Sequence, residues 1–262
     1  MIFDKELNIM QGIFEIKGIT FGSGRPVICV PVMEKKKEDI IAKIRHLTER
    51  GAAMIEWRVD GFEAVEQPEK VKEIFREIAP MLEKTVFLFT FRTKKQGGCI
   101  QLEEKKILYL NELAAKSGCV DLLDLEFFEA TKPEKEIRRF QRMGVRVIAS
   151  HHDFEQTPDD RILHMLMDQM ERGGADIAKL AVMPQNPDDV LRLLKLTNDT
   201  REKYPELPVI TMSMGAYGVI SRISGEFFGS CVTFGADGAV SAPGQMQMEK
   251  LDMILESLHA CM

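Results

Sequence analysis

The sequence predicts an α/β protein with the fold of a (β/α)8 TIM barrel, preceded by an N-terminal β-hairpin. Short apolar runs alternate with longer amphipathic segments along the chain, which is typical of repeated βα units around a parallel sheet. We count eight such units, the number that closes a barrel. A doubly wound open sheet is the main alternative. It usually carries a glycine-rich phosphate-binding motif, and none of GxGxxG, GxxxxGKS and GxxxxGKT occurs in the sequence.

The expected elements follow one another in a regular order. Short runs at 12–17 and 19–22 predict a hairpin that covers the bottom of the barrel. The predicted strands are 26–32, 53–59, 85–91, 121–127, 145–150, 176–182, 208–214 and 230–236. The predicted helices, several of which begin with proline or end before glycine, are 36–50, 67–82, 102–117, 133–143, 158–172, 187–204, 219–228 and 246–260. Because no low-complexity linker interrupts this series, residues 1–262 are expected to form one domain.

Composition excludes several classes of protein. A hydrophobic content of 45% over 262 residues is enough for a large core. The net charge of -6 comes without a basic stripe, so nucleic acid is not an expected partner. Five scattered cysteines without a CxxC motif indicate free thiols in a reducing compartment and do not favour a zinc site. No apolar run approaches the roughly 18 residues of a membrane span, and the first residues lack a signal-peptide pattern, so a cytoplasmic protein is expected.

Lys179 interrupts the run 177–182, which otherwise has the pattern of a strand buried on both faces. Burial disfavours the ammonium form of a lysine and favours the neutral amine, which can attack a carbonyl carbon. The alternative is a structural lysine neutralised by a carboxylate, because buried charges are normally paired. This segment alone leaves both interpretations open.

Further charges gather on the same side of the predicted sheet, because side chains two residues apart on a strand share a face. In strand 53–59 the apolar Ile55 and Trp57 oppose Glu56 and Arg58, and strands 85–91 and 121–127 repeat this pattern. The charged residues expected to converge on one mouth, together with the string His151-His152-Asp153, are Glu56, Arg58, Arg92, Glu126 and Lys179. Since each buried charge carries a desolvation cost, such a cluster indicates function rather than packing.

Other candidates are weaker. Alternation places His151 and His152 on opposite faces, so at most one of them is expected to be catalytic. Three histidines on predicted helices or near the C-terminus are expected to be solvated: His46, His164 and His259. Met212 and Met214 either fill the core or line a pocket, and Arg222 lies in a helical pattern that usually carries solvated charges. The glycine-flanked loop 235–245 suits a mobile lid.

Seven strings, distributed in order over essentially the whole chain, together resemble type I 3-dehydroquinate dehydratase of the shikimate pathway. They are EWRVD (56–60), FTFR (89–92), HDF (152–154), GADIAK (174–179), TMSM (211–214), VISR (219–222) and SAPGQ (241–245). Each string is weak alone, but their joint occurrence at compatible spacing is highly specific.

The resemblance implies a homodimeric barrel enzyme, a carbon–oxygen hydro-lyase that acts on the small molecule 3-dehydroquinate without a cofactor or a metal. It implies that Lys179 forms a Schiff base with the substrate ketone and that His152 is the general acid and base. Glu56 is expected to position His152 or Lys179. The substrate-binding residues that the resemblance implies are Arg58, Arg92, Met212, Arg222, Phe234, Ser241, Ala242 and Gln245. Of these, Arg222 is the expected partner of the substrate carboxylate.

Two positions depart from the family pattern. Gln96 stands where many members have a glutamate that supports the histidine, so the pKa of His152 is expected to be lower here. Pro31 stands where some members have serine, which removes one polar contact. Neither change removes a group that the expected reaction needs.

Three other functions fit parts of the pattern. Another Schiff-base barrel, such as a class I aldolase, needs an interior lysine but usually adds a phosphate site near its last strands. A metal-dependent barrel hydrolase or isomerase would use Glu56, Glu126, His152 and Asp153 as ligands, although neighbouring cations would repel a divalent ion. A non-catalytic carboxylate-binding barrel would keep the arginines without needing a nucleophilic lysine.

Overall fold

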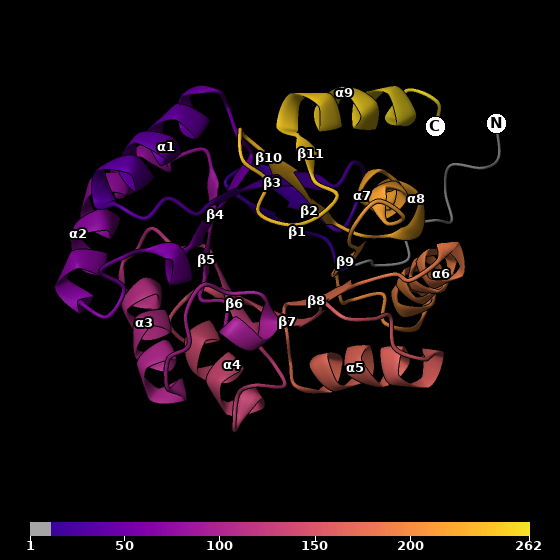
Figure 1. Ribbon diagram of the computed structural model, residues 1–262, viewed down its shortest axis with the longest axis horizontal. Helices are drawn as coiled ribbons and strands as arrows, with labels where there is room; N and C mark the ends of the chain where they lie inside the picture. The colour runs from indigo at the N-terminus through magenta and orange to yellow at the C-terminus, as the bar shows by residue number, and fades with distance from the viewer. Residues whose placement is uncertain (1–11) are drawn as a thin grey trace.

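In the computed structural model, which describes residues 12–262, parallel strands curl into a (β/α)8 barrel with helices around it (Figure 1). The sheet order is β11-β10-β3-β4-β5-β6-β7-β8-β9. Its ends meet where Val209 of β9 bridges Ser230, just before β10, and the Cys231 amide donates to the Val209 carbonyl at 2.8 Å. The predicted fold class is therefore confirmed. The expectation that the first residues carry no signal segment falls on 1–11, outside the described residues.

The observed elements lie close to the predicted ones. The strands are β1 Phe14–Ile16, β2 Ile19–Phe21, β3 Val27–Val32, β4 Met54–Arg58, β5 Val86–Thr90, β6 Leu122–Glu126, β7 Arg146–Asp153, β8 Ile177–Val182, β9 Val209–Ser213, β10 Val232–Ala236 and β11 Met246–Gln247. The α-helices are α1 Lys37–Glu49, α2 Pro68–Ile78, α3 Glu104–Lys116, α4 Pro133–Gln141, α5 Asp160–Arg172, α6 Pro187–Lys203, α7 Val219–Ile223, α8 Gly225–Phe228 and α9 Met248–His259. Short 3-10 helices are Val59–Gly61, Ala79–Met81 and Lys94–Gln96.

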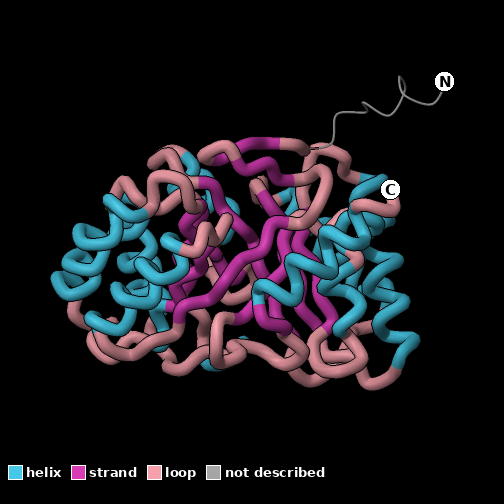
Figure 2. Tube along the Cα trace, turned by 90° about the horizontal axis from the view of Figure 1, so that it is seen from above, coloured by secondary structure: helices cyan, strands magenta, loops and turns pink. Residues whose placement is uncertain are grey.

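The hairpin β1–β2 lies across one end of the barrel, as predicted (Figure 2). Phe21 is fully buried and packs with the inward residues at the start of the strands, such as Val27 and Val86. Lys17 ties the hairpin to this end, because its Nζ donates to the carbonyl of Thr85 at 3.0 Å. The candidate site lies at the opposite end of the barrel, where the strands finish.

Two apolar layers follow from the alternation of the strands. The outer layer joins outward residues such as Trp57 and Phe89 to the surrounding helices, and the inner layer fills the lower barrel with residues such as Leu88 and Ile148. Above Leu88 and Ile148, the inward positions become polar. This change from apolar to polar along β5 and β7 marks the level of the site, whereas Met212 of β9 and Phe234 of β10 keep the inner face apolar there.

The structure departs from several predicted boundaries. The predicted helix 219–228 breaks at Ser224 into α7 and α8, and residues 246–247 form the short β11 instead of a first helical turn. Helix α5 begins at Asp160 and not at Pro158, because Asp159 is its N-cap residue. The Asp159 carboxylate accepts the Ile162 amide at 3.0 Å. Strand β7 continues to Asp153, because its pairing with β8 runs through both histidines. Within residues 12–262, no helix combines the length and the hydropathy that a membrane crossing needs.

Candidate active site

The strand register brings the inward polar residues to one level near the carboxyl ends of the strands. Thr90 lies opposite Asp124, and Ser150 lies opposite both Glu126 and Lys179. Adjacent parallel strands lie about 4.8 Å apart, so side chains on the same face at this level reach one another. The predicted convergence of charges at one mouth is therefore observed.

Lys179 lies inside the barrel with only 3% of its surface exposed. Its Nζ donates to Asp124 Oδ2 at 3.0 Å and lies 3.8 Å from Glu56 Oε1. The ring of Phe234 covers the same nitrogen, with its centroid 4.7 Å away. The lysine thus faces the mouth, and the carboxylate partner expected of a buried lysine is observed.

Arg92 is held by two buried carboxylates. Its Nη2 lies 2.9 Å from Asp124 Oδ2, and its Nη1 donates to Glu126 Oε1 and to Ser150 Oγ, each at 3.0 Å. Burial would lower the pKa of Arg92, but Asp124 and Glu126 outweigh it and raise the pKa. Burial would likewise raise the pKa of Asp124, but the charges of Arg92 and Lys179 lower it to about 2. Asp124 is therefore an anion throughout the physiological pH range.

Arg58 is paired with Asp60 through two hydrogen bonds, Nε to Oδ1 at 2.8 Å and Nη2 to Oδ2 at 2.9 Å. The same carboxylate accepts the backbone amides of Arg92 at 3.3 Å and Cys99 at 2.9 Å. Burial opposes the charged form, but Arg58 and these amides keep the pKa of Asp60 below its usual value. Asp60 thereby ties β4 to the loop that follows β5.

His152 lies in the mouth and is held by Gln96. The Oε1 atom of Gln96 accepts the His152 backbone amide at 2.8 Å and lies 3.2 Å from Nδ1 of the ring. An acceptor at this position assigns the proton to Nδ1 and leaves the Nε2 lone pair free to act as a base. Burial and the charges of Arg92 and Lys179 hold the pKa of His152 well below its ordinary value of 6.5, so the ring is neutral.

His151 points to the other face of β7, as alternation predicts. Its ring packs against Phe128 with a centroid distance of 5.3 Å and an interplanar angle of 84°. Glu56 contacts the lysine rather than the histidine: its Oε1 accepts the Thr90 hydroxyl at 2.8 Å, and His152 makes no hydrogen bond to it. The surface positions predicted for the three remaining histidines are observed.

Arg222 is buried, so its interpretation as a solvated charge is wrong. It is 1% exposed on α7, its Nη2 donates to the Pro243 carbonyl at 2.9 Å, and its Nη1 lies 3.9 Å from Met212 Sδ. Its Nε has no hydrogen-bond partner in the described part of the chain, and burial lowers the pKa of Arg222 to about 10. Among residues 12–262, no carboxylate pairs with it, in contrast to Arg58 and Arg92. A helical pattern alone cannot show that the short α7 is packed beneath the loop after β10.

These groups line a cavity of about 80 Å³ at the mouth. Its lining residues are Glu56, Arg58, Arg92, Gln96, Gly97, His152, Phe154, Lys179, Ala181, Met212, Met214, Phe234, Ser241, Ala242 and Gln245. The loop after β10 supplies the last three, and Gln245 Oε1 accepts the Ser241 amide at 2.8 Å. The residues that the family resemblance assigned to the site all line this cavity except Arg222, which lies behind Met212. Glu126, which strand alternation also placed at the mouth, lines the neighbouring second cavity and reaches the site through Arg92.

Sequence reasoning left out Asp124, Asp60 and Ser150. Alternation placed Asp124 on the inward face, but no sequence signal distinguishes the carboxylate that contacts Lys179. Ser150 Oγ donates to Asp124 Oδ1 at 2.6 Å. No group of three or more histidine, cysteine or acidic side chains within 12–262 is arranged to hold a metal ion.

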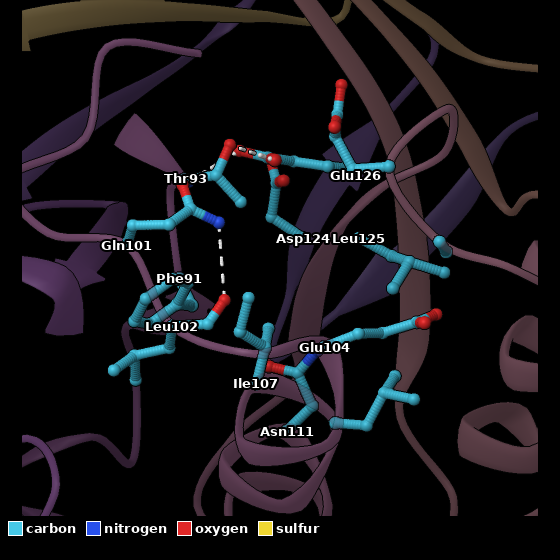
Figure 3. Close-up of a pocket in the computed structure, with 13 residues that line it drawn as sticks. Phe91, Thr93, Gln101, Leu102, Glu104, Ile107, Asn111, Asp124, Leu125 and Glu126 are labelled. Carbon is cyan, nitrogen blue, oxygen red and sulfur yellow. Dashed lines mark hydrogen bonds between the residues drawn. The ribbon is translucent and has the colours of Figure 1, made fainter. Parts of the chain in front are cut away.

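A second cavity, of about 100 Å³, lies between the segment that follows β5, strand β6 and helix α3 (Figure 3). Glu126 separates it from the mouth, because its Oε2 accepts the Thr93 hydroxyl at 2.7 Å while its Oε1 accepts Arg92. Asn111 reaches into this cavity from α3, and its buried Oδ1 accepts no hydrogen bond from the residues that the structure describes. The second cavity thus contacts the charged cluster through Asp124 and Glu126, and its lining residues include no nucleophile and no unpaired cation.

Comparisons with known proteins agree with this geometry. A family model described as type I 3-dehydroquinase matches residues 28–262. Over 246 residues the chain is 44% identical to 3-dehydroquinate dehydratase of Clostridioides difficile (strain 630), covering 94% of this chain and 96% of that protein. It is 42% identical over 253 residues to the enzyme of that name from Klebsiella pneumoniae, covering 95% of this chain and 100% of that protein. The crystal structure of type I 3-dehydroquinate dehydratase from Clostridium difficile with covalently modified comenic acid superposes with a TM-score of 0.92 at 42% identity, covering 97% and 100% of the two chains.

Proposed function

The chain belongs to the type I 3-dehydroquinase family and is a 3-dehydroquinate dehydratase of the shikimate pathway, and we propose that it acts through a Schiff base on Lys179 with His152 as general acid and base. One observation carries this mechanism. A buried amine, Lys179 Nζ, and a neutral imidazole, His152, line the same small cavity. A nucleophile beside a positioned base is the combination that imine-dependent elimination needs.

The proposed reaction begins when Lys179, after losing a proton, attacks the C3 ketone of 3-dehydroquinate. The C3–N bond forms, the ketone oxygen leaves as water, and a protonated imine, the iminium, remains. Because the iminium withdraws electrons, the adjacent C2 proton becomes acidic, and His152 Nε2 removes it to leave an enamine. The enamine electrons then expel the C1 hydroxyl, which takes the proton from His152 and departs as a second water. Hydrolysis of the product imine restores Lys179 and releases 3-dehydroshikimate.

Arg222 is the proposed partner of the substrate carboxylate. Arg58 and Arg92 already have carboxylate partners, whereas Arg222 finds none among residues 12–262 and keeps an Nε without a partner there. Burying a guanidinium without an anion costs desolvation free energy. A bound carboxylate would offset this free energy through charge-assisted hydrogen bonds.

The other proposed substrate-binding groups line the cavity in which the substrate ring would lie. They are Arg58, Arg92, Met212, Phe234, Ser241, Ala242 and Gln245. Glu56 is proposed to position Lys179, which it approaches to 3.8 Å. We further propose a cytoplasmic homodimer in which residues 1–262 form one catalytic domain.

Borohydride reduction followed by mass spectrometry tests the proposal. With 3-dehydroquinate, the adduct is expected on Lys179, the one lysine within a strand among residues 12–262. Lys179→Ala should abolish the adduct and lower turnover by several orders of magnitude, well beyond the roughly 100-fold loss caused by misplacing a reacting group. Lys95→Ala is the matched control, because Lys95 follows β5 with 73% of its side chain exposed and should leave both unchanged. An adduct that persists in Lys179→Ala would refute the mechanism, and trapping only with a different ketone would favour an aldolase.

A further inference from the structure

We propose that Asp124 is a catalytic residue, the counter-ion that keeps the Lys179 imine protonated during the elimination. The inference rests on the proposed Schiff base and names the group that makes that imine reactive. Asp124 lies on β6, 55 residues from Lys179 in sequence, and its Oδ2 accepts from Lys179 Nζ at 3.0 Å. The atom it contacts is the atom that would become the imine nitrogen.

The position of Asp124 is fixed by partners on both carboxylate oxygens. Ser150 Oγ donates to Oδ1 at 2.6 Å, and Arg92 Nη2 approaches Oδ2 at 2.9 Å beside Lys179. The side chain of Asp124 is completely buried. The negative charge is therefore held in place before substrate arrives, with no water to reorganise when the imine forms.

Asp124 fits the role of counter-ion better than the other carboxylates of the cluster. Asp60 is paired with Arg58, and Glu126 is shared between Arg92 and Thr93. Glu56 lies 3.8 Å from Lys179 Nζ, further than Asp124, and its nearer oxygen already accepts the Thr90 hydroxyl.

The chemistry needs such an anion. The ammonium form of a lysine and a neutral ketone together carry one positive charge. The iminium and the water formed from them carry the same single charge, and it stays on the same nitrogen. Only the protonated imine withdraws electrons strongly enough to make the C2 proton acidic. An anion in contact with that nitrogen favours the protonated form and raises its pKa by about 1 to 3 units. Asp124 would thus keep the imine active at alkaline pH.

Asp124→Asn tests this role, because it keeps the shape of the side chain and removes its charge. The variant should fold, since Arg92 keeps Glu126 and Lys179 keeps Glu56 as carboxylate partners. We expect the pH above which kcat falls to decrease by about 1 to 3 units relative to the wild-type protein. Borohydride trapping on Lys179 should decline over the same lowered range, because hydride reduces the protonated imine.

Glu126→Gln is the matched control. It removes a buried carboxylate from the same Arg92 at 3.0 Å but leaves Asp124 beside Lys179, so it should keep the wild-type alkaline limit. If Asp124→Asn does not fold, Asp124→Leu removes the same charge without adding a polar group and should show the same shift.

The outcomes separate this inference from the proposed function. If the wild-type protein gives no adduct on Lys179, the Schiff-base mechanism is refuted, and the counter-ion role of Asp124, which depends on it, is refuted too. If the wild-type protein gives the adduct and the folded Asp124 variant keeps both kcat and the alkaline limit, the Schiff base stands and the counter-ion role is refuted. An equal shift in Glu126→Gln would refute it as well, because the effect would then belong to Arg92.

Discussion

Replacing Gln96 by glutamate should raise the pKa of His152 and move the acid limit of catalysis to higher pH. The wild-type Gln96 offers a neutral oxygen to the histidine ring, and its buried Nε2 makes no hydrogen bond to any residue of 12–262. The substitution therefore breaks no hydrogen bond made by Nε2, and it places a negative charge beside Nδ1. The histidine acts as a base only when it is neutral, so a higher pKa means that activity is lost at a higher pH as the solution is acidified.

The size of the shift follows from the contact distance. Coulomb's law at the 3.2 Å between Gln96 Oε1 and His152 Nδ1 gives about 1 to 5 kcal/mol for effective dielectric constants of about 80 to 20. This corresponds to about 1 to 4 pKa units, and contacts of this kind in proteins shift pKa values by about 1 to 3 units. The wild-type acid limit should lie below about pH 6.5, because burial, Arg92 and Lys179 lower the pKa of His152.

Two measurements check this prediction. The acid limb of kcat/KM should move up by about 1 to 3 pH units in Gln96→Glu. A titration of the histidine ring signals by NMR should report the same shift without substrate. Gln101→Glu, which adds a charge at an exposed position further along the same loop, should leave the limb in place. An unchanged or lowered acid limit in Gln96→Glu, with the fold intact, would refute the assignment of Gln96 as the partner of Nδ1.

Two further predictions concern the histidines and the loop after β10. His152→Ala should slow dehydration by about 100- to 10,000-fold while still allowing the imine to form slowly. His151→Ala should lower activity only slightly, because the His151 ring packs outside the cavity. Kinetics and borohydride trapping of both variants check this, and a larger loss in His151→Ala than in His152→Ala would contradict the register of β7. Hydrogen exchange of residues 237–245 should slow once the reduced adduct occupies the site, since Ser241 and Gln245 line the cavity. Equal exchange in the free and adducted protein, with kcat and KM intact in Gln245→Ala, would show that the loop is only a connector.

The sequence alone determined the order of elements and the side of the sheet to which each strand residue points. Both depend on local geometry: apolar periodicity separates strands from helices, and the pleat of a strand sends alternate side chains to opposite faces. For this reason the sequence places Glu56 and Lys179 toward the mouth and puts His151 and His152 on opposite faces, while the choice of His152 as the histidine of the site comes from the family resemblance. The ordered strings that resemble one family add substrate and mechanism, which periodicity cannot supply.

Only the tertiary structure decided which charges touch. Lys179 and Asp124 are 55 residues apart, so their contact depends on the register between strands, which a local pattern does not encode. The family resemblance places Gln96 beside His152, 56 residues away, but only the path of the loop shows that Gln96 Oε1 faces both Nδ1 and the backbone amide. Arg222 was misjudged for the same reason, because its burial depends on a loop 21 residues further along that covers the short α7. Local sequence sets the direction of a side chain, whereas its partners and its exposure are set by segments that meet only when the barrel closes.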